Sequence, residues 1–158
     1  MWPAIVAASF LAQALPPRAP GGVEIGVASA LEKLRPGDSV PRGASVDLVA
    51  ARGECEAAQI AVRSARALAA LSAAAAPLDG GARLPVALYR VATLRLPAPS
   101  GPDGEPGEWP DPLVPERDAF FGEPRRAFPV VVAARRLQAI WVEVCVPHDA
   151  PPGRYRGV

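Results

Sequence analysis

The sequence has 158 residues, with 17 Lys and Arg against 16 Asp and Glu, and its formal net charge is +1. This balance excludes a strongly charged surface, so the composition suggests neither a nucleic acid nor an anionic membrane as a partner. Its 20 prolines and 14 glycines disfavour long helices and favour short strands joined by turns. A chain of this length can bury a sizeable core within one domain.

The N-terminal segment 1–14 is predicted to be a signal peptide. Residues 4–12 form an uncharged apolar run, and Ala12 and Ala14 are small residues at the two positions that a signal peptidase reads. The run is too short to span a bilayer. Because no Lys or Arg precedes it, a mis-assigned start codon or a cytoplasmic tail stays open as the alternative. We expect a secreted or periplasmic protein without a membrane span, in which residues 15–22 form a linker and 23–158 the folded domain.

Most of this domain alternates apolar with other side chains in a two-residue period, which indicates strands. The stretch 65–78 is dominated by alanine. It is either a helix, since alanine is the best helix former, or an irregular strand with a loop. Six or seven short strands at this spacing predict an all-β fold, an antiparallel β-sandwich of the immunoglobulin or jelly-roll kind. The predicted strands cover residues 23–27, 45–50, 56–63, 84–96, 128–133 and 139–146.

The closing stretch of the sequence carries the clearest strand pattern. Residues 140–146 place Ile and Val on one face, and the turn 151–153 then reverses the chain. Residues 154–158 are predicted to begin a partner strand that the sequence leaves incomplete. We therefore expect the chain to be the front portion of a longer protein. The apolar face of 140–146 would then lack one strand neighbour and be prone to aggregation.

The segment 97–115 is predicted to be a long, stiff loop rich in Pro, Gly and acidic residues. Such a loop is usually functional or a strap pinned by its own side chains. Its four acidic residues are conceivable calcium ligands, but their spacing matches no EF-hand, and solvated charge is the simpler interpretation. We assign Trp109, Asp111 and Trp141 as candidate binding residues for a glycan or an interdomain contact, although tryptophans are more often core or strap residues. The acidic residues are Asp103, Glu105, Glu108 and Asp111.

No catalytic constellation emerges from the sequence. The sole histidine, His148, lies in a predicted turn without a positioned nucleophile or orienting partner, so we interpret it as a solvated turn residue. Glu54 and Glu56 share a face of one predicted strand, as a glycosidase carboxyl pair would. A glutamate that accepts backbone N–H groups or pairs with an Arg is the simpler interpretation. We expect no catalytic residue and no cofactor.

The two cysteines, Cys55 and Cys145, allow more than one interpretation. In an exported protein they could pair, but pairing requires neighbouring strands with facing side chains, which the sequence cannot show. Separate free thiols are the interpretation that we prefer. Two thiols are too few for a structural zinc site, and we expect no metal.

Three motifs in order resemble a known family. They are Ala51-Arg-Gly-Glu-Cys-Glu-Ala-Ala-Gln-Ile-Ala-Val62, Trp109-Pro-Asp-Pro-Leu-Val-Pro115, and Trp141-Val-Glu-Val-Cys-Val-Pro147 followed by Pro152-Gly-Arg-Tyr-Arg-Gly157. Together they resemble the N-terminal β-sandwich region of glycoside hydrolase family 123 and its relatives, many described only as domain of unknown function 4091.

In that family a (β/α)-barrel follows the sandwich and carries an adjacent Asp-Glu pair, and the substrate's own N-acetyl group attacks the anomeric carbon. The resemblance thus implies that this chain is not itself an enzyme. It implies a non-catalytic accessory domain of an exported glycoside hydrolase-like protein, which supports a downstream catalytic barrel of an N-acetylhexosaminidase-like parent. The alternative is an independent carbohydrate-binding or adhesion module.

Overall fold

A computed structural model describes residues 5–10, 22–99, 101–102 and 104–157. The described residues form no helix, and the strands pair mainly antiparallel, which confirms the predicted all-β class. The strands are β1 (Ile5–Phe10), β2 (Val23–Ser29), β3 (Val46–Ala51), β4 (Cys55–Ser64), β5 (Leu68–Leu71), β6 (Leu78–Asp79), β7 (Arg83–Leu84), β8 (Val86–Leu96), β9 (Gly107–Pro115), β10 (Val130–Val132), β11 (Leu137–Cys145) and β12 (Arg154–Tyr155).

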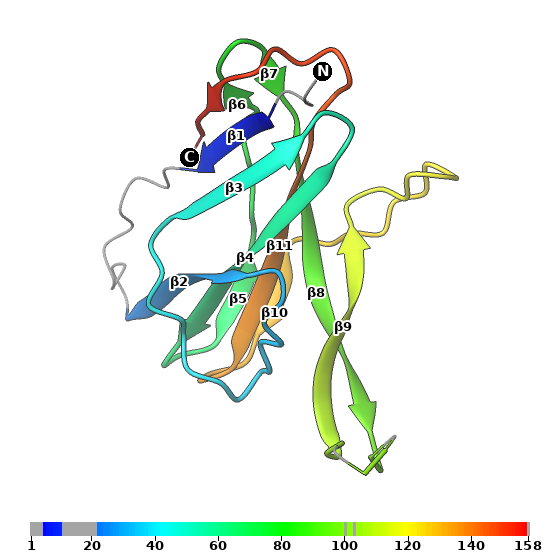
Figure 1. The fold of residues 1–158 in the computed structure, drawn as a ribbon. Coiled ribbons are helices and arrows are strands. Elements are labelled where there is room, and N and C mark those ends of the chain that lie inside the picture. Colours follow the sequence, from blue (N-terminus) through cyan, green and yellow to red (C-terminus); the bar gives the residue numbers. More distant parts are fainter. Residues whose placement is uncertain (1–4, 11–21, 100, 103, 158) are drawn as a thin grey trace.

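One five-stranded antiparallel sheet, in the order β2-β4-β11-β8-β9, forms the main layer (Figure 1). Its central strand is β11, and β4 and β8 pair with it on either side. The prediction that this strand lacks a neighbour is therefore wrong. The strand that follows it, β12, pairs with β1 in parallel instead. A turn after β11 thus sends the chain into a different sheet.

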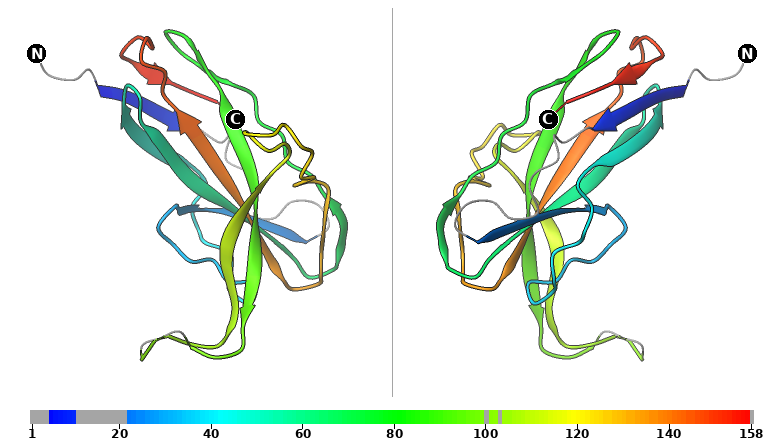
Figure 2. Two further views of the ribbon diagram at one scale, coloured as in Figure 1. Left: turned by 90° about the vertical axis from the view of Figure 1, so that its right-hand side faces the viewer. Right: turned by 90° about the vertical axis from the view of Figure 1, so that its left-hand side faces the viewer.

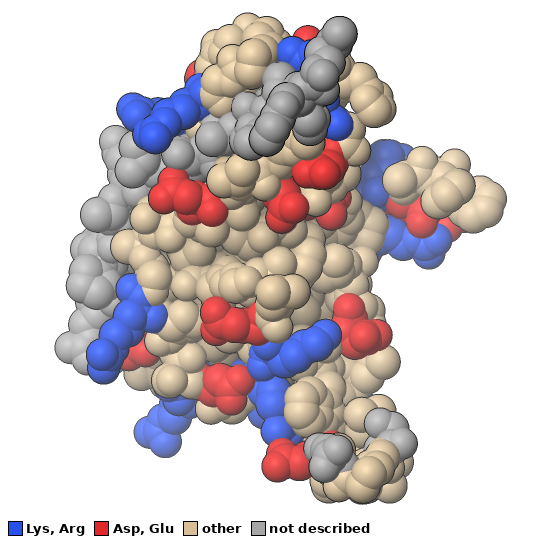
Figure 3. Space-filling model, in the orientation of Figure 1, with Lys and Arg blue, Asp and Glu red and all other residues tan. Residues whose placement is uncertain are grey.

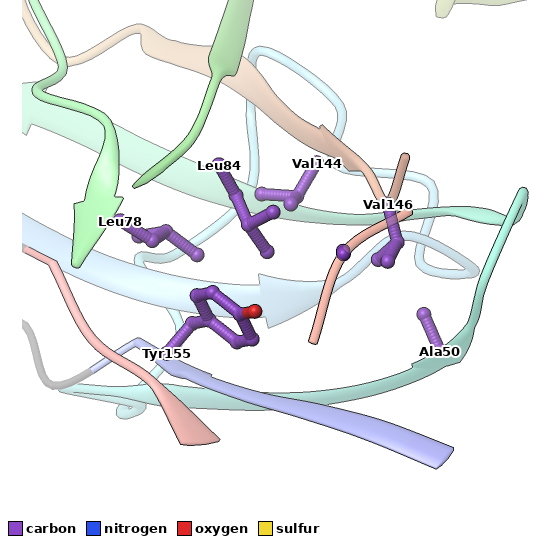
Figure 4. Close-up of a cluster of buried hydrophobic side chains, with 7 residues drawn as sticks. Ala50, Leu78, Leu84, Val144, Val146 and Tyr155 are labelled. Atoms are coloured by element: carbon purple, nitrogen blue, oxygen red, sulfur yellow. The ribbon is translucent and has the colours of Figure 1, made fainter. Parts of the chain in front are cut away.

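Smaller sheets make up a second, discontinuous layer over one face of the main sheet. At one end lie the sheet β12-β1-β3 and the pair β6-β7, and at the other end lies the pair β10-β5. The first end is closed by a cluster around Tyr155, whose side chain is fully buried and whose hydroxyl donates to the Pro151 carbonyl at 2.7 Å (Figure 4). This cluster, hereafter the tyrosine cluster, consists of Ala50, Leu78, Leu84, Val144, Val146, Ala150 and Tyr155.

The other face of the main sheet is covered by the segment 30–42, which connects β2 to β3. Leu34 is buried there against Ala61, Val91 and Ala139. The Gln59 amide fixes the segment by donating to the carbonyls of Ser29 and Glu32, at 3.0 and 2.8 Å. A buried amide with two partners satisfies its own hydrogen-bonding need while it orders the covering loop.

The structure decides two predictions about segments 97–115 and 65–78. The predicted loop 97–115 is wrong in its second half, because residues 107–115 form β9, which pairs with β8. Its prolines are tolerated because β9 is an edge strand, where a missing N–H costs no ladder bond. The alanine-rich stretch 65–78 is not helical. It forms β5, a loop and the start of β6, which confirms the alternative prediction of an irregular strand with a loop.

The two cysteines form a disulfide, so our preference for free thiols is wrong. Cys55 and Cys145 stand opposite each other as the last pair of the β4–β11 ladder. Only the register of two strands distant in sequence places the thiols together. Cys145 also lies between Val144 and Val146, so the disulfide fastens the end of the sheet that carries the tyrosine cluster.

Part of the predicted signal peptide is described as structure. Residues 5–10 form β1, the middle strand of the sheet β12-β1-β3. Residues 1–4 and 11–14 of the predicted peptide lie outside the described residues, as do residues 15–21 of the predicted linker. The part of the chain that the structure describes contains no helix long and apolar enough to cross a membrane.

Candidate functional site

An apolar groove of about 770 Å³ opens on the main sheet between the two parts of the second layer. Its floor comes from β2, β4, β8 and β11, and one wall is the stretch 68–76. None of the lining residues that the structure describes carries a charge or an aromatic ring. The floor includes Ile25, Ala58, Ile60, Leu88, Ile140 and Val142.

The groove exists because the side chains above it are short. Residues 73–76 of the wall are all alanine, whereas the floor carries branched side chains from adjacent strands. A methyl group cannot reach across the space that a Leu or Phe would fill. Ile60 and Leu88, in the middle of the sheet, are consequently only partly buried, although Ile140 opposite Ile60 is 3% exposed. The apolar run opposite an alanine run was the signal in the sequence that could have revealed the groove.

A second feature is the loop 116–127, hereafter the phenylalanine loop, which projects from the body of the molecule (Figure 1). Phe120 and Phe121 at its tip are 94% and 81% exposed. The Asp118 carboxylate accepts hydrogen bonds from the backbone N–H groups of both, at 3.0 and 2.8 Å. The Gly122 N–H donates to the Asp118 carbonyl at 3.0 Å. The tip is therefore a hydrogen-bonded turn that presents two aromatic rings to solvent.

Ion pairs and a buried root stiffen the rest of this loop. Arg125 pairs with Asp118 at 3.5 Å and with Glu123 at 3.0 Å. The hydrogen bond from Phe121 N–H, with those from Phe120 N–H and Arg125, lowers the pKa of the Asp118 carboxyl against a smaller opposing effect of desolvation. At the root, Glu116 accepts a hydrogen bond from the Phe128 N–H at 2.8 Å. The sequence shows Phe120-Phe121 plainly, but no pattern in it shows that both rings are exposed.

The structure brings two of the three predicted site residues together. Asp111 and Trp141 line a dimple of about 170 Å³ on the face opposite the groove. This is smaller than the roughly 300–1,000 Å³ of typical ligand pockets. The Trp141 Nε1 atom is buried there without a hydrogen-bond partner among the described residues. Next to it in the ladder, burial and then the Glu143 carboxylate raise the pKa of the Tyr89 hydroxyl, which donates to Glu143 at 3.2 Å.

Trp109 lies apart from this dimple, and its ring and indole N–H both contact other residues of the same chain. The Arg35 guanidinium stacks over its ring at 4.3 Å from the centroid, and the indole N–H donates to the Glu105 carbonyl at 2.9 Å. Arg35 also pairs with the Glu105 carboxylate at 3.1 Å. These contacts fasten the β8–β9 hairpin to the segment 30–42, and they occupy one face of the ring that a sugar would stack on.

The remaining predicted residues that the structure describes assemble no reaction centre. His148 is exposed in its turn. The Glu54 carboxylate accepts the Ala51 N–H at 2.8 Å, the backbone-binding role that the sequence suggested. Within the described part of the chain, no three His, Cys, Asp or Glu side chains are placed to hold a metal ion. Glu108 pairs with Arg136, and Asp103 lies outside the described residues.

The most distinctive features of the molecule are thus an uncharged apolar groove and a stiff loop with two exposed phenylalanines, and neither belongs to the site predicted from the sequence.

A comparison with models of known protein families finds no match for this sequence, and a search among curated proteins finds none either.

Proposed function

We propose that this chain is a non-catalytic accessory domain of an exported glycoside hydrolase-like protein, and that it docks apolar polypeptide in its groove. The observation that carries the proposal is the groove itself. A sheet face lined with branched aliphatic side chains is normally covered, because each contact with water is unfavourable. Here the middle of the face is left open by the alanine wall.

The chemistry of the groove favours polypeptide over sugar. Sugar binding needs hydrogen-bonding groups and aromatic faces, whereas the described lining offers two Ser hydroxyls and otherwise aliphatic side chains and one Gly. Covering the half-buried Ile25, Ile60 and Leu88 would stabilise a complex by about 1 kcal/mol for each side chain. An apolar segment that fills the groove would therefore gain several kcal/mol from its floor alone.

The parent protein is proposed from the resemblance of the three sequence motifs to glycoside hydrolase family 123. On that basis a downstream barrel carries the N-acetylhexosaminidase-like chemistry, and the present domain supports the barrel. The Cys55–Cys145 disulfide supports an exported parent, because disulfides persist mainly in oxidising compartments.

The groove is tested with the apolar-surface dye anilinonaphthalene sulfonate and a matched pair of variants. Ala70 and Ala69 are exposed neighbours in β5, but only Ala70 lines the groove. We expect the dilute, folded chain to bind the dye, Ala70→Glu to lower the uptake several-fold, and Ala69→Glu to leave it unchanged. A cooperative thermal melt verifies folding of each protein. Equal uptake by the two variants, or none by the folded wild type, would contradict the proposal.

A glycan titration distinguishes the alternative function, an independent carbohydrate-binding module, from the proposed docking of polypeptide. We expect no binding of N-acetylhexosamine oligosaccharides by the isolated chain. Binding that disappears in Trp141→Ala would instead favour an independent carbohydrate-binding module built on the Trp141–Asp111 dimple.

A further inference from the structure

We infer that the groove receives Phe120 and Phe121 of a second copy, so that two domains exchange their phenylalanine loops in a closed dimer. This inference rests on the docking role proposed for the groove and names its occupant. It accounts with one contact for two apolar features of the described residues, the exposed ring pair and the open sheet face.

The phenylalanine loop is built as a rigid anchor. Two adjacent rings, 94% and 81% exposed, stand on a turn held by the Asp118 carboxylate and the Arg125 ion pairs. A loop already fixed in one conformation loses little entropy when it binds. Aromatic anchors that enter a partner's pocket are the side chains that contribute most to protein interfaces.

The charges around the rings favour a protein partner over an anionic membrane. In Figure 3 the tip of the projecting loop is tan, with blue and red side chains gathered behind it. The loop carries as many acidic as basic residues, and Arg125 is already paired with Asp118 and Glu123. A loop that binds anionic lipid would instead carry a net excess of basic residues for the headgroups. The charged residues are Glu116, Arg117, Asp118, Glu123, Arg125 and Arg126.

The groove fits these rings in size and polarity. Its volume of about 770 Å³ lies within the range of about 300–1,000 Å³ that drug-sized ligands occupy. Its described lining holds no aromatic ring and no charge, so a phenyl group would meet aliphatic carbon on the floor and along the alanine wall. Ile60 and Leu88, half-buried in this chain, would become covered.

The loop begins beside the groove. Its root, Ala127 and Phe128, is buried in the cluster that also holds Ile140, Leu88 and Leu68 of the groove lining. The loop and the wall segment lie on the same side of the main sheet (Figure 2). Beyond this root the tip projects outward, away from its own sheet (Figure 1). In a two-fold pair, each tip can therefore cross to the groove of the other copy.

The buried area favours two reciprocal contacts over one. Two Phe side chains bury roughly 300–500 Å², and the facing groove loses roughly 250 Å² at most, so one contact totals roughly 550–750 Å². That is well below the roughly 1,200 Å² at which stable interfaces begin, whereas two contacts total roughly 1,100–1,500 Å² and reach that range. The exchange should thus close on a dimer of two 16.4 kDa chains, not extend as a fibre.

Sedimentation velocity over a range of concentrations tests the exchange with the full chain. We expect the wild type to pass from monomer to dimer in the micromolar range. Phe120→Asp/Phe121→Asp should weaken association by roughly 30-fold or more for each ring, and Ala70→Glu should weaken it from the groove side. Leu31→Asp is the control, since Leu31 is 92% exposed away from both features. All four proteins should melt alike as monomers, because the changed side chains are exposed.

Two further measurements separate this inference from the docking role. Dye uptake per chain should fall as the wild type dimerises and stay constant for Phe120→Asp/Phe121→Asp. A mixture of this double variant with Ala70→Glu should form a weak heterodimer, since one intact ring pair meets one intact groove. A wild type that remains monomeric, or a double variant that still dimerises, overturns the exchange. If dye uptake still depends on Ala70, the docking role survives. Ring-dependent binding of a monomer to phosphatidylcholine vesicles would also overturn the exchange, in favour of a membrane anchor.

Discussion

The tyrosine cluster and the groove lie on the same face of the main sheet, and the sheet contributes aliphatic side chains to both. They differ in how completely the second layer covers those side chains. At the tyrosine cluster, Val144 of the main sheet is 1% exposed, and Leu84 of β7, which packs against it, is 0% exposed. In the groove, Ile60 and Leu88 belong to the same sheet but are only half-buried. Long side chains, above all Tyr155, reach down onto the first part, whereas the second faces a row of alanines. The burial of a strand face is therefore decided by the segment that lies over it.

The difference between the covered end and the open groove has a functional interpretation. The closed end contributes stability, because its apolar side chains exchange water for protein contacts on folding. The open part keeps the same apolar character but leaves it available to a partner. We infer that stability and docking are separated along one sheet, and the following predictions test that separation.

The largest expected effect is the loss of the disulfide, which fastens the closed end. Cys55 and Cys145 are 90 residues apart in sequence, and a crosslink over a loop of this size is expected to contribute about 4–5 kcal/mol by restricting the unfolded chain. Urea unfolding of Cys55→Ser/Cys145→Ser should show this loss in the free energy of unfolding. Reduction of the wild type is the control and should give a similar change. A loss below about 1 kcal/mol would mean that the closed end does not depend on the disulfide.

A matched pair of leucines compares the two parts directly. Leu84→Ala at the closed end removes a fully buried side chain and should cost about 3 kcal/mol, because it leaves a cavity. Leu88→Ala in the groove should cost about 1 kcal/mol, because the side chain is only partly buried and no enclosed cavity forms. Chemical denaturation of the monomers measures both. Equal losses would show that the groove is closed in solution.

Much of the fold could be predicted from local pattern. Two-residue alternation located β2, β4, β8 and β11, because each carries an apolar face that the sequence displays. It failed for β9, because proline is a strand breaker on average, yet an edge strand tolerates it. The pairing of Cys55 with Cys145 was also beyond the sequence, since it depends on the register of two strands far apart in the chain.

The candidate site was less predictable than the fold. A groove is a property of two segments and the distance between them, so neither the branched floor nor the alanine wall reveals it alone. The exposure of Phe120 and Phe121 likewise depends on the Asp118 turn and the buried root of the loop. Local pattern predicts which residues are apolar, and only the tertiary arrangement decides which of them stay uncovered.

A smaller effect is expected from removing the predicted signal peptide. A chain that begins at Leu15 lacks β1, so β3 and β12 lose the strand between them. We expect a loss on the order of 2 kcal/mol, because each lost backbone hydrogen bond contributes about 0.5–1.5 kcal/mol, and part of the strand edge remains solvated. Hydrogen exchange should show this loss in β3, while β11 keeps its protection. Unchanged exchange in β3 would mean that β1 does not hold the closed end.

The smallest effect concerns the phenylalanine loop, whose order depends on one carboxylate. The Phe121 N–H, followed by the Phe120 N–H and Arg125, lowers the pKa of Asp118 below its ordinary value of 3.8. A group with a lowered folded pKa contributes order that is complete above the ordinary value and is lost as the pH falls through the folded value. Nuclear magnetic resonance should therefore show the amide signals of Phe120 and Phe121 shifting with a midpoint below pH 3.8, with no change near neutrality. Asp118→Asn, which keeps the acceptor oxygen, should abolish this titration but retain the turn, whereas Asp118→Ala should lose both. A midpoint above 3.8 would mean that the loop does not stabilise the carboxylate, and that the two rings are not held as a preformed anchor.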